Sequence, residues 1–246
     1  MNSPRPDDHG IRALVFDVFG TVVDWRSSIV REGEALSAAK GLAVDWPALA
    51  DAWRAGYQPA MQRTMQPGPD GQVAWVHVDD LHRGILDPLL SRFGLESLSE
   101  EERGELNRVW HRLDPWPDAL AGLRRLKSRF TISTLSNGNV SLLVDMAKRA
   151  RLPWDCVLSA ELFHKYKPDP AVYLGAAALL GVAPAELLMV AAHPGDLAAA
   201  QRAGLRTAYV PRPLEHGHDG AQEPVGDLRF DWTASGFVDL AAQLGA

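Results

Sequence analysis

The segment Leu14–Asp24, with the sequence LVFDVFGTVVD, guides the interpretation of the whole chain. Its apolar beginning predicts a strand buried in a parallel sheet. Asp17 ends that strand, and Gly20, which follows shortly after, lets the chain turn close to a ligand. Ligands bind at the carboxyl ends of strands in open α/β sheets, so Asp17 is a candidate working carboxylate. An aspartate that only caps a turn is the alternative.

Composition and charge limit the kinds of protein that this chain can be. Its 246 residues, 46% of them hydrophobic and 23% charged, are ordinary for a globular protein with a sizeable core. The formal net charge of −6 argues against nucleic-acid binding, which usually needs a basic surplus. The single cysteine, Cys156, excludes an intramolecular disulfide and favours a reducing cytoplasm.

No segment predicts export or membrane insertion. Residues 1–10 are polar and lack the apolar stretch of a signal peptide. The most apolar region, Ala171–Ala192, is interrupted by Pro184 and Glu186 and predicts a core helix, a loop and a strand. A cytoplasmic protein without membrane contact is therefore expected. The stretch Pro211–Gly226, which is rich in Gly, His and Pro, predicts a surface loop.

Two regions with different periodicity indicate two domains. Residues 25–113 contain apolar residues at helical spacing and no convincing strand, which predicts a separate helical cap domain. The predicted cap helices are Ser28–Lys40, Trp46–Met65, Val76–Phe93 and Ser99–His111. A cap beside a catalytic face can exclude water from the reaction. Residues 1–24 and 114–246 are expected to form the core domain.

The core region alternates between strands and helices, which predicts an α/β fold with a doubly wound parallel sheet. The predicted strands after the first are Phe130–Leu135, Cys156–Ala160, Leu187–Ala192 and Thr207–Val210. The predicted helices are Asp118–Lys127, Val140–Arg149, Pro170–Leu180, Leu197–Ala203 and Phe237–Leu244.

Polar residues follow four of the predicted strands. The ends of parallel strands lie on one edge of a sheet, so these side chains can converge. They are Asp17 and Thr21, then Ser136 and Asn137, then Lys167, and finally His193 and Asp196. Each residue alone has an ordinary structural explanation, as a turn former, a solvated lysine or a helix N-terminal acid. Their combination predicts an active site.

These motifs together resemble the haloacid dehalogenase superfamily. The matching segments are Asp17–Thr21, Leu135–Gly138, Tyr166–Asp169 with Tyr173, and Val190–Asp196. The resemblance extends over residues 14–244 and includes the position of the helical cap. It implies a Rossmann-like core in which the carboxylate of the first motif is a nucleophile.

Two positions distinguish this chain from the phosphatases of that superfamily. In those enzymes the first motif has the pattern Asp-x-Asp. In this chain the residue two after Asp17 is Phe19, which cannot transfer a proton. They also carry an acid pair that holds magnesium, and here Ala192 replaces the earlier acid while Asp196 remains. A phosphoryl group would then meet an anionic Asp17 without the usual cation.

Displacement at carbon is the chemistry that remains. A carboxylate can displace halide from an alkyl halide, and water then hydrolyses the ester. Halide leaves without a proton, so no general acid is needed. The resemblance therefore implies a type II (S)-2-haloacid or haloacetate dehalogenase that uses no metal and no other cofactor. The expected substrates are water and short 2-haloalkanoic acids, with fluoroacetate among the candidates, and the products are 2-hydroxy acids.

The resemblance also implies the catalytic residues. Asp17 is the nucleophile, and Lys167 keeps it ionised because a nearby cation lowers a carboxylate pKa. Arg54, from the cap, receives the leaving halide, and Asn137 is a second contact to the halide or the substrate. Asp196 orients Lys167 and helps to place the hydrolytic water. An exposed position on a helix is the alternative for Arg54.

A further set of residues is expected to bind or position the substrate. Thr21 positions the nucleophile, Ser136 holds the substrate carboxylate, and Tyr173 forms a hydrogen bond into the site. Phe19 and Trp75 are candidate apolar walls. Core packing is the favoured alternative for Trp75.

The chain departs from the better-known haloacid dehalogenases at two positions. Ala191 and His193 stand where those enzymes carry a serine and an asparagine. A hydroxyl is thereby lost, and a bulkier group is gained that can donate a hydrogen bond or titrate near neutrality. Some members that accept fluoroacetate resemble this pattern, which favours a short haloacetate. His193 as a plain strand-end residue is the alternative.

Several alternatives remain open at this stage. One is a magnesium-dependent phosphatase or phosphonatase of the same fold, and another is a non-catalytic protein with this fold. His77, Asp79, Asp80 and His82 suggest a metal site, but the spacing of the histidines fits one helical face poorly, so a solvated face is expected. The apolar cap and the family resemblance favour a homodimer.

Overall fold

The computed structural model describes residues 9–67, 71, 73–218 and 220–246. Its six-stranded sheet has the order β5-β4-β1-β6-β7-β8, and all neighbouring strands pair in parallel. The strands are β1 (Ala13–Phe16), β4 (Thr131–Ser136), β5 (Cys156–Ser159), β6 (Leu187–Ala191), β7 (Arg206–Tyr209) and β8 (Trp232–Thr233). The predicted doubly wound α/β sheet is confirmed. β1 lies between β4 and β6, so Asp17 emerges at the centre of the edge.

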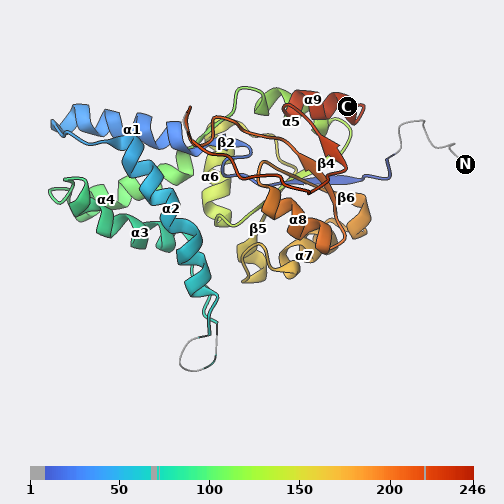
Figure 1. Cartoon of the computed structure of the whole chain (residues 1–246), viewed down its shortest axis with the longest axis horizontal. Helices are drawn as coiled ribbons and strands as arrows, with labels where there is room; N and C mark the ends of the chain where they lie inside the picture. Colours follow the sequence, from blue (N-terminus) through green and yellow to red (C-terminus); the bar gives the residue numbers. More distant parts are fainter. Residues whose placement is uncertain (1–8, 68–70, 72, 219) are drawn as a thin grey trace, which may run out of the picture.

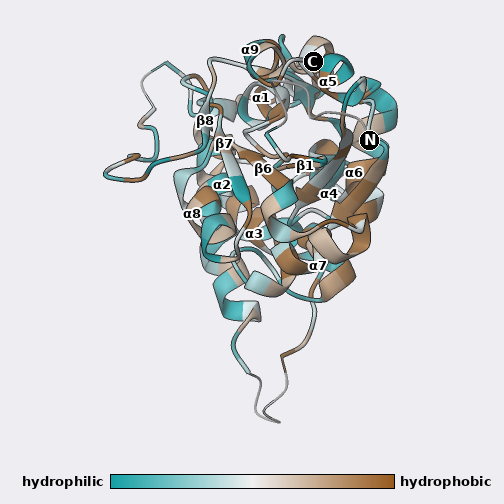
Figure 2. Cartoon of the chain, turned by 90° about the vertical axis from the view of Figure 1, so that its right-hand side faces the viewer, coloured by the Kyte–Doolittle hydropathy of each residue, from teal (hydrophilic) through white to brown (hydrophobic). Residues whose placement is uncertain are grey.

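Helices cover both faces of this sheet (Figure 1). Leu14 and Phe16 pack in the cluster that contains α5 (Ala119–Lys127), α6 (Val140–Ala150) and α9 (Phe237–Gln243), whereas Ala13 and Val15 pack with α7 (Pro170–Leu180) and α8 (Pro194–Arg202). Successive residues of a strand point to opposite faces, which explains this division. Figure 2 shows the apolar strands enclosed between the helices. A sheet buried on both faces holds its strand ends in fixed positions.

A helical insertion, residues 25–113, lies to one side of the sheet (Figure 1). It contains α1 (Trp25–Lys40), α2 (Trp46–Thr64), α3 (Val78–Arg92), α4 (Glu100–Asn107) and the 3₁₀ helix η1 (Arg108–Arg112). The insertion begins after β2 (Val23–Asp24) and ends before β3 (Asp114–Pro115), which pair antiparallel. This pair was not predicted, because two-residue strands show no periodicity. It brings the two ends of the insertion together.

The apolar core continues from the sheet into the insertion, and His82 is part of it. His82 is only 1% exposed, and its ring stacks on that of Trp110 with the centroids 4.0 Å apart. Burial lowers the pKa of His82 well below its ordinary value, so the ring is neutral. The expectation of a solvated face was therefore wrong for His82, because this side of α3 faces aromatic residues. His77, at the start of α3, is exposed.

The expectation of a surface loop at Pro211–Gly226 was wrong at Arg212 and Glu215, which are both buried. Arg212 Nε donates to the Thr21 carbonyl at 2.9 Å, so the loop is attached to the first motif. Asp219, in the same stretch, lies outside the described residues. Residues 1–8, which belong to the polar N-terminal segment that argues against a signal peptide, also lie outside them.

In the part of the chain that the structure describes, no helix is long and apolar enough to cross a membrane.

Candidate active site

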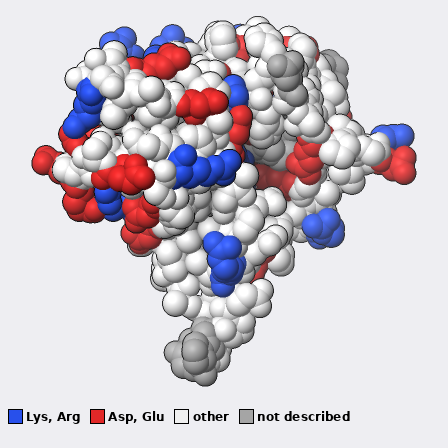
Figure 3. All heavy atoms as spheres, turned by 60° about the vertical axis from the view of Figure 1, so that its left-hand side comes forward, with Lys and Arg blue, Asp and Glu red and all other residues white. Residues whose placement is uncertain are grey.

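A cavity of about 290 Å³ lies at the carboxyl edge of the sheet, against α2. It is lined by Asp17, Phe19, Arg54, Tyr57, Gln58, Met61, Asn137, Lys167, Pro168, His193, Gly195, Asp196, Arg202 and Glu223. The structure thus brings together all the residues predicted to be catalytic. A larger cavity of about 830 Å³ lies between α3, α4, η1 and α6 and contains none of them. In Figure 3 a hollow in the surface has acidic side chains at its floor.

Asp17 lies directly after β1, and both of its carboxylate oxygens accept hydrogen bonds. Oδ1 accepts from Lys167 Nζ at 2.9 Å, and Oδ2 accepts from Thr21 Oγ1 at 2.7 Å and contacts His193 Nδ1 at 3.0 Å. Burial raises the pKa of Asp17, but the charge of Lys167 and the bonds from His193 and Thr21 outweigh it. Together they hold the pKa far below its ordinary value, so this carboxylate is ionised.

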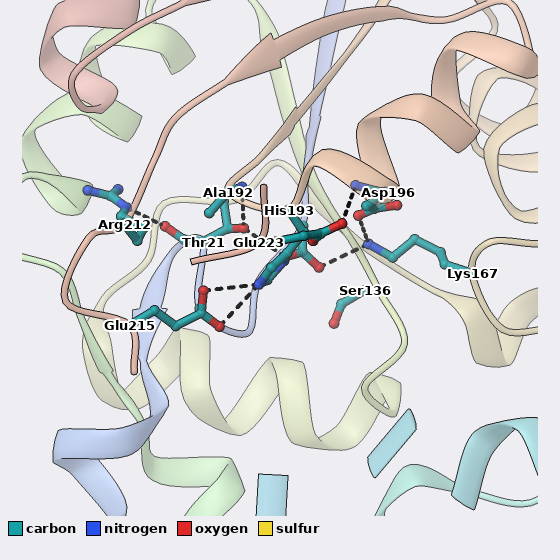
Figure 4. Close-up of polar contacts among 12 residues, drawn as sticks. Thr21, Ser136, Lys167, Ala192, His193, Asp196, Arg212, Glu215 and Glu223 are labelled. Atoms are coloured by element: carbon teal, nitrogen blue, oxygen red, sulfur yellow. Dashed lines mark hydrogen bonds and ion pairs between the residues drawn. The ribbon is translucent and has the colours of Figure 1, made fainter. Parts of the chain in front are cut away.

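Lys167 connects two buried carboxylates. Its Nζ also donates to Asp196 Oδ2 at 2.5 Å (Figure 4). The other oxygen of Asp196 accepts from the Tyr173 hydroxyl at 2.5 Å. Burial lowers the pKa of Lys167, but the two carboxylates outweigh it and raise the pKa above its ordinary value. The lysine is therefore a permanent cation at the nucleophile. Its backbone N–H donates to Asn137 Oδ1 at 2.8 Å, which connects the second and third motifs.

His193 lies between Asp17 and a second carboxylate, Glu215. Its Nε2 is 3.1 Å from both oxygens of Glu215 (Figure 4). Glu215 Oε1 also accepts from Trp25 Nε1 at 3.0 Å. Burial lowers the pKa of His193, but the two carboxylates raise it to about 10. The ring is thus a cation at neutral pH, although the sequence suggested titration near neutrality.

Glu215 was not predicted, because it lies in an irregular loop. The first motif contains one sign of this contact, the glycine at position 20. A Cβ at Gly20 would lie 2.1 Å from Glu215 Oε1, so only glycine leaves room for this carboxylate. Glu223, from the same loop, also lines the cavity and accepts from Gly195 N at 2.9 Å.

The end of the cavity that α2 forms contains side-chain hydrogen-bond donors with few partners. Arg54 lies with its guanidinium 5.0 Å from the ring centroid of Tyr57, and within the described residues it forms no ion pair. The Asn137 side-chain nitrogen, Nδ2, lies 3.4 Å from the sulfur of Met61. The buried Tyr57 hydroxyl has no hydrogen bond of normal geometry in the described part, although Asn137 is close enough to affect its pKa. This end of the cavity suits an anion.

Tyr57 and Met61 were missed in the sequence. Their positions three and seven residues after Arg54 are those of one helical face, so the spacing could have identified them.

Four predicted binding residues do not line this cavity. Thr21 and Tyr173 act on it through Asp17 and Asp196, as described above. Ser136 is buried at the end of β4, where its hydroxyl accepts from Gly138 N at 3.2 Å. Trp75 lies in a separate small pocket and packs on Tyr166 with the ring centroids 4.6 Å apart. Trp75 therefore packs against other side chains, as the alternative to an apolar cavity wall predicted.

The residues at Asp17 do not fit a magnesium site of the phosphatase kind. Magnesium needs free oxygen ligands, but one oxygen of Asp17 is bonded to the Lys167 cation and the other to the His193 ring. The earlier acid of the phosphatase pair is Ala192, which supplies no oxygen from its side chain.

The fold and site define a class of α/β proteins with a helical insertion and an ionised strand-end aspartate paired with a lysine. The haloacid dehalogenase-like hydrolase family model matches residues 11–204. The chain belongs to this family, which confirms the resemblance seen in the motifs.

Individual relatives are similar over nearly the whole chain. (S)-2-haloacid dehalogenase 4A of Burkholderia cepacia is 31% identical, over 90% of this chain and 94% of its own length. A crystal structure of an L-2-haloacid dehalogenase shares 46% identity with a TM-score of 0.87, covering 95% of this chain and 99% of its own. A defluorinating L-2-haloacid dehalogenase shares 44% identity with a TM-score of 0.90, covering 99% and 100%.

Proposed function

We propose that this protein is a 2-haloacid dehalogenase, a hydrolase that replaces the halogen of a short 2-haloalkanoic acid by a hydroxyl group. The observation that carries the proposal is the ionised Asp17, paired with Lys167 and facing a cavity that also contains Arg54. The relatives named as 2-haloacid dehalogenases support this substrate class, and the defluorinating structure supports fluorinated substrates among them.

In the first step Asp17 displaces the halide. Oδ1 has one hydrogen bond and Oδ2 has two contacts, so Oδ1 retains more lone-pair capacity for the attack. Its electron pair forms the new C–O bond, and the C–halogen pair leaves with the halide. Arg54 and Asn137 face the same cavity and receive the halide there. Phe19 packs edge-on against Trp110 and provides an apolar wall.

In the second step water hydrolyses the aspartyl ester. Water adds to Cγ of Asp17, and Asp196 takes one proton and later returns it to the departing hydroxy acid. Lys167 lies between the two carboxylates and keeps Asp196 near the ester. No step requires a metal.

Residues 25–113 form the cap in this proposal, and residues 1–24 with 114–246 form the core. The cap supplies Arg54 and Tyr57 from α2, whereas the core supplies the nucleophile and its lysine. A cap over the core limits the access of bulk water to the site. A homodimer and a cytoplasmic location stay predictions.

Halide release in the presence of EDTA tests the proposed function. We expect release from chloroacetate, fluoroacetate and one or both enantiomers of 2-chloropropionate, unaffected by the chelator because the cations at Asp17 belong to side chains. Magnesium-dependent release of phosphate from an aryl phosphate would instead identify a phosphatase. No turnover of either panel by a folded protein would identify a non-catalytic member of the family.

Arg54→Gln is expected to slow halide release strongly. Removing a preorganised cation from the leaving group costs about 10²–10³-fold in rate. Single-turnover halide release from chloroacetate measures this step. Arg63→Gln is the matched control, because Arg63 is an exposed arginine of the same helix. Equal rates for the two variants would remove Arg54 from the halide site.

A further inference from the structure

Two donors point to the same oxygen of Asp17. The Thr21 hydroxyl accepts from Ala192 N at 2.9 Å, so its proton is directed to Asp17 Oδ2, 2.7 Å away. His193 Nδ1 lies 3.0 Å from the same oxygen. These two donors lower the pKa of the resting carboxylate, and they still face this oxygen once Oδ1 is alkylated. Paired donors on one oxygen are the arrangement that stabilises an oxyanion.

Glu215 determines the state of the His193 ring. It is 5% exposed, and both of its oxygens lie 3.1 Å from Nε2, which requires a proton on that nitrogen. With Asp17 facing Nδ1, both ring nitrogens donate to carboxylates, which favours the doubly protonated ring. Arg54 is the other charged group that acts on Glu215, and it helps to keep Glu215 ionised.

We propose that Thr21 and His193 form an oxyanion hole for hydrolysis of the aspartyl ester, and that Glu215 is a positioning residue that keeps His193 cationic. This inference rests on the proposed function, because it concerns the second step of that reaction.

Alkylation of Oδ1 leaves Oδ2 as the ester carbonyl oxygen, still facing Thr21 and His193. Water adds to Cγ, and the carbonyl π pair moves onto Oδ2, where the two donors hold the negative charge. When the carbonyl forms again, the Cγ–Oδ1 bond breaks and Oδ1 leaves in the hydroxy acid. One water proton reaches the product oxygen through Asp196, and the other leaves to solvent as Asp17 becomes a carboxylate again.

These donors affect the two steps in opposite directions. They stabilise the resting carboxylate, which makes Asp17 a weaker nucleophile, and they stabilise the oxyanion of ester hydrolysis. Loss of the His193 cation should therefore slow hydrolysis selectively and cause the ester to accumulate. A merely structural role would slow both steps or neither.

Glu215→Gln and His193→Phe, which removes the ring donor, test this proposal by rapid-quench kinetics with chloroacetate. We expect ester hydrolysis to fall by about 10²-fold in both variants, with alkylation unchanged or faster. The signature is a burst of one halide per site and a mass increase on the peptide that contains Asp17. Asp227→Asn is the control, because Asp227 is an exposed acid of the same loop region outside the cavity.

The pH dependence of hydrolysis separates an oxyanion hole from a general base. The two carboxylates raise the pKa of His193 to about 10 in the resting site. Alkylation removes the charge of Asp17, so in the ester this pKa lies below 10, and the cation and fast hydrolysis are lost as pH rises through that lower value. In Glu215→Gln this pKa falls, so the loss begins at lower pH. Hydrolysis that instead accelerates as His193 deprotonates would overturn the proposal, as would equal effects on both steps. Wild type that forms no ester at all would contradict the proposed function instead.

Discussion

Asp17→Asn is expected to reduce halide release by at least about 10⁴-fold, because an amide cannot displace halide from carbon. The variant should fold, since asparagine has nearly the same size and can still accept from Thr21. Halide release from chloroacetate and the absence of a covalent adduct measure the loss. Asp87→Asn is the control, because Asp87 is an exposed acid in a surface ion pair with Arg83. Turnover that survives in Asp17→Asn would place the nucleophile elsewhere.

The rate at which wild-type Asp17 is alkylated should not fall because Asp17 itself becomes protonated when the pH is lowered. Lys167, His193 and Thr21 hold the pKa of Asp17 far below 3.8, so Asp17 remains ionised at all pH values above that. Any fall in alkylation between pH 7 and pH 5 must then come from another group.

Lys167→Met is expected to have the second largest effect, on activity and on stability together. Removing one partner of a buried ion pair costs about 3–5 kcal/mol, because it leaves uncompensated charge in the interior. Here the Nζ lies between Asp17 and Asp196, and both lose a partner. We expect turnover to fall by at least about 10³-fold as the Asp17 pKa rises and its preorganised cation is lost.

Urea denaturation at two pH values checks the stability of Lys167→Met. The low folded-state pKa of Asp17 contributes stability that is present above its unfolded value of about 3.8 and is lost as pH falls through the folded value. The stability gap between wild type and variant should therefore be largest at neutral pH and shrink below pH 4. Lys165→Met, at an exposed lysine two residues earlier, should match the wild type. A gap that is independent of pH would show that the pairing with the carboxylates is not its cause.

Positive charge at Asp17 comes from two side chains in this protein. Lys167 contacts one oxygen, and His193, secured by Glu215, contacts the other. The change to Ala191 leaves no hydroxyl on the last residue of β6, while the change to His193 adds a cation two residues later. This arrangement explains how the site can work where the acid pair of the phosphatases is incomplete.

Much of the fold could be predicted because its signals are local. The apolar run before Asp17 and the alternation after residue 118 specify buried strands and covering helices, and the structure has them within a few residues. Helix ends were less accurate. α8 begins at Pro194 rather than Leu197, because proline fits the first turn of a helix. The strand pair β2–β3 and strand β8 were not predicted, because each of these strands has only two residues and shows no periodicity.

The sequence by itself determined that Asp17 and Asn137 directly follow β1 and β4 and that Asp196 lies in the helix after β6, because a parallel sheet brings these strand ends to one edge. Lys167 follows β5 only after the 3₁₀ helix η2 (Ala160–Phe163), so its position also depends on the path of that loop. Only the tertiary structure decided which residues complete the site. Glu215 reaches His193 from a loop whose path depends on packing, and Trp75 and His82 are placed by aromatic neighbours distant in the sequence. Local patterns specify elements and their edges, whereas contacts between irregular loops depend on three-dimensional packing that no short segment encodes.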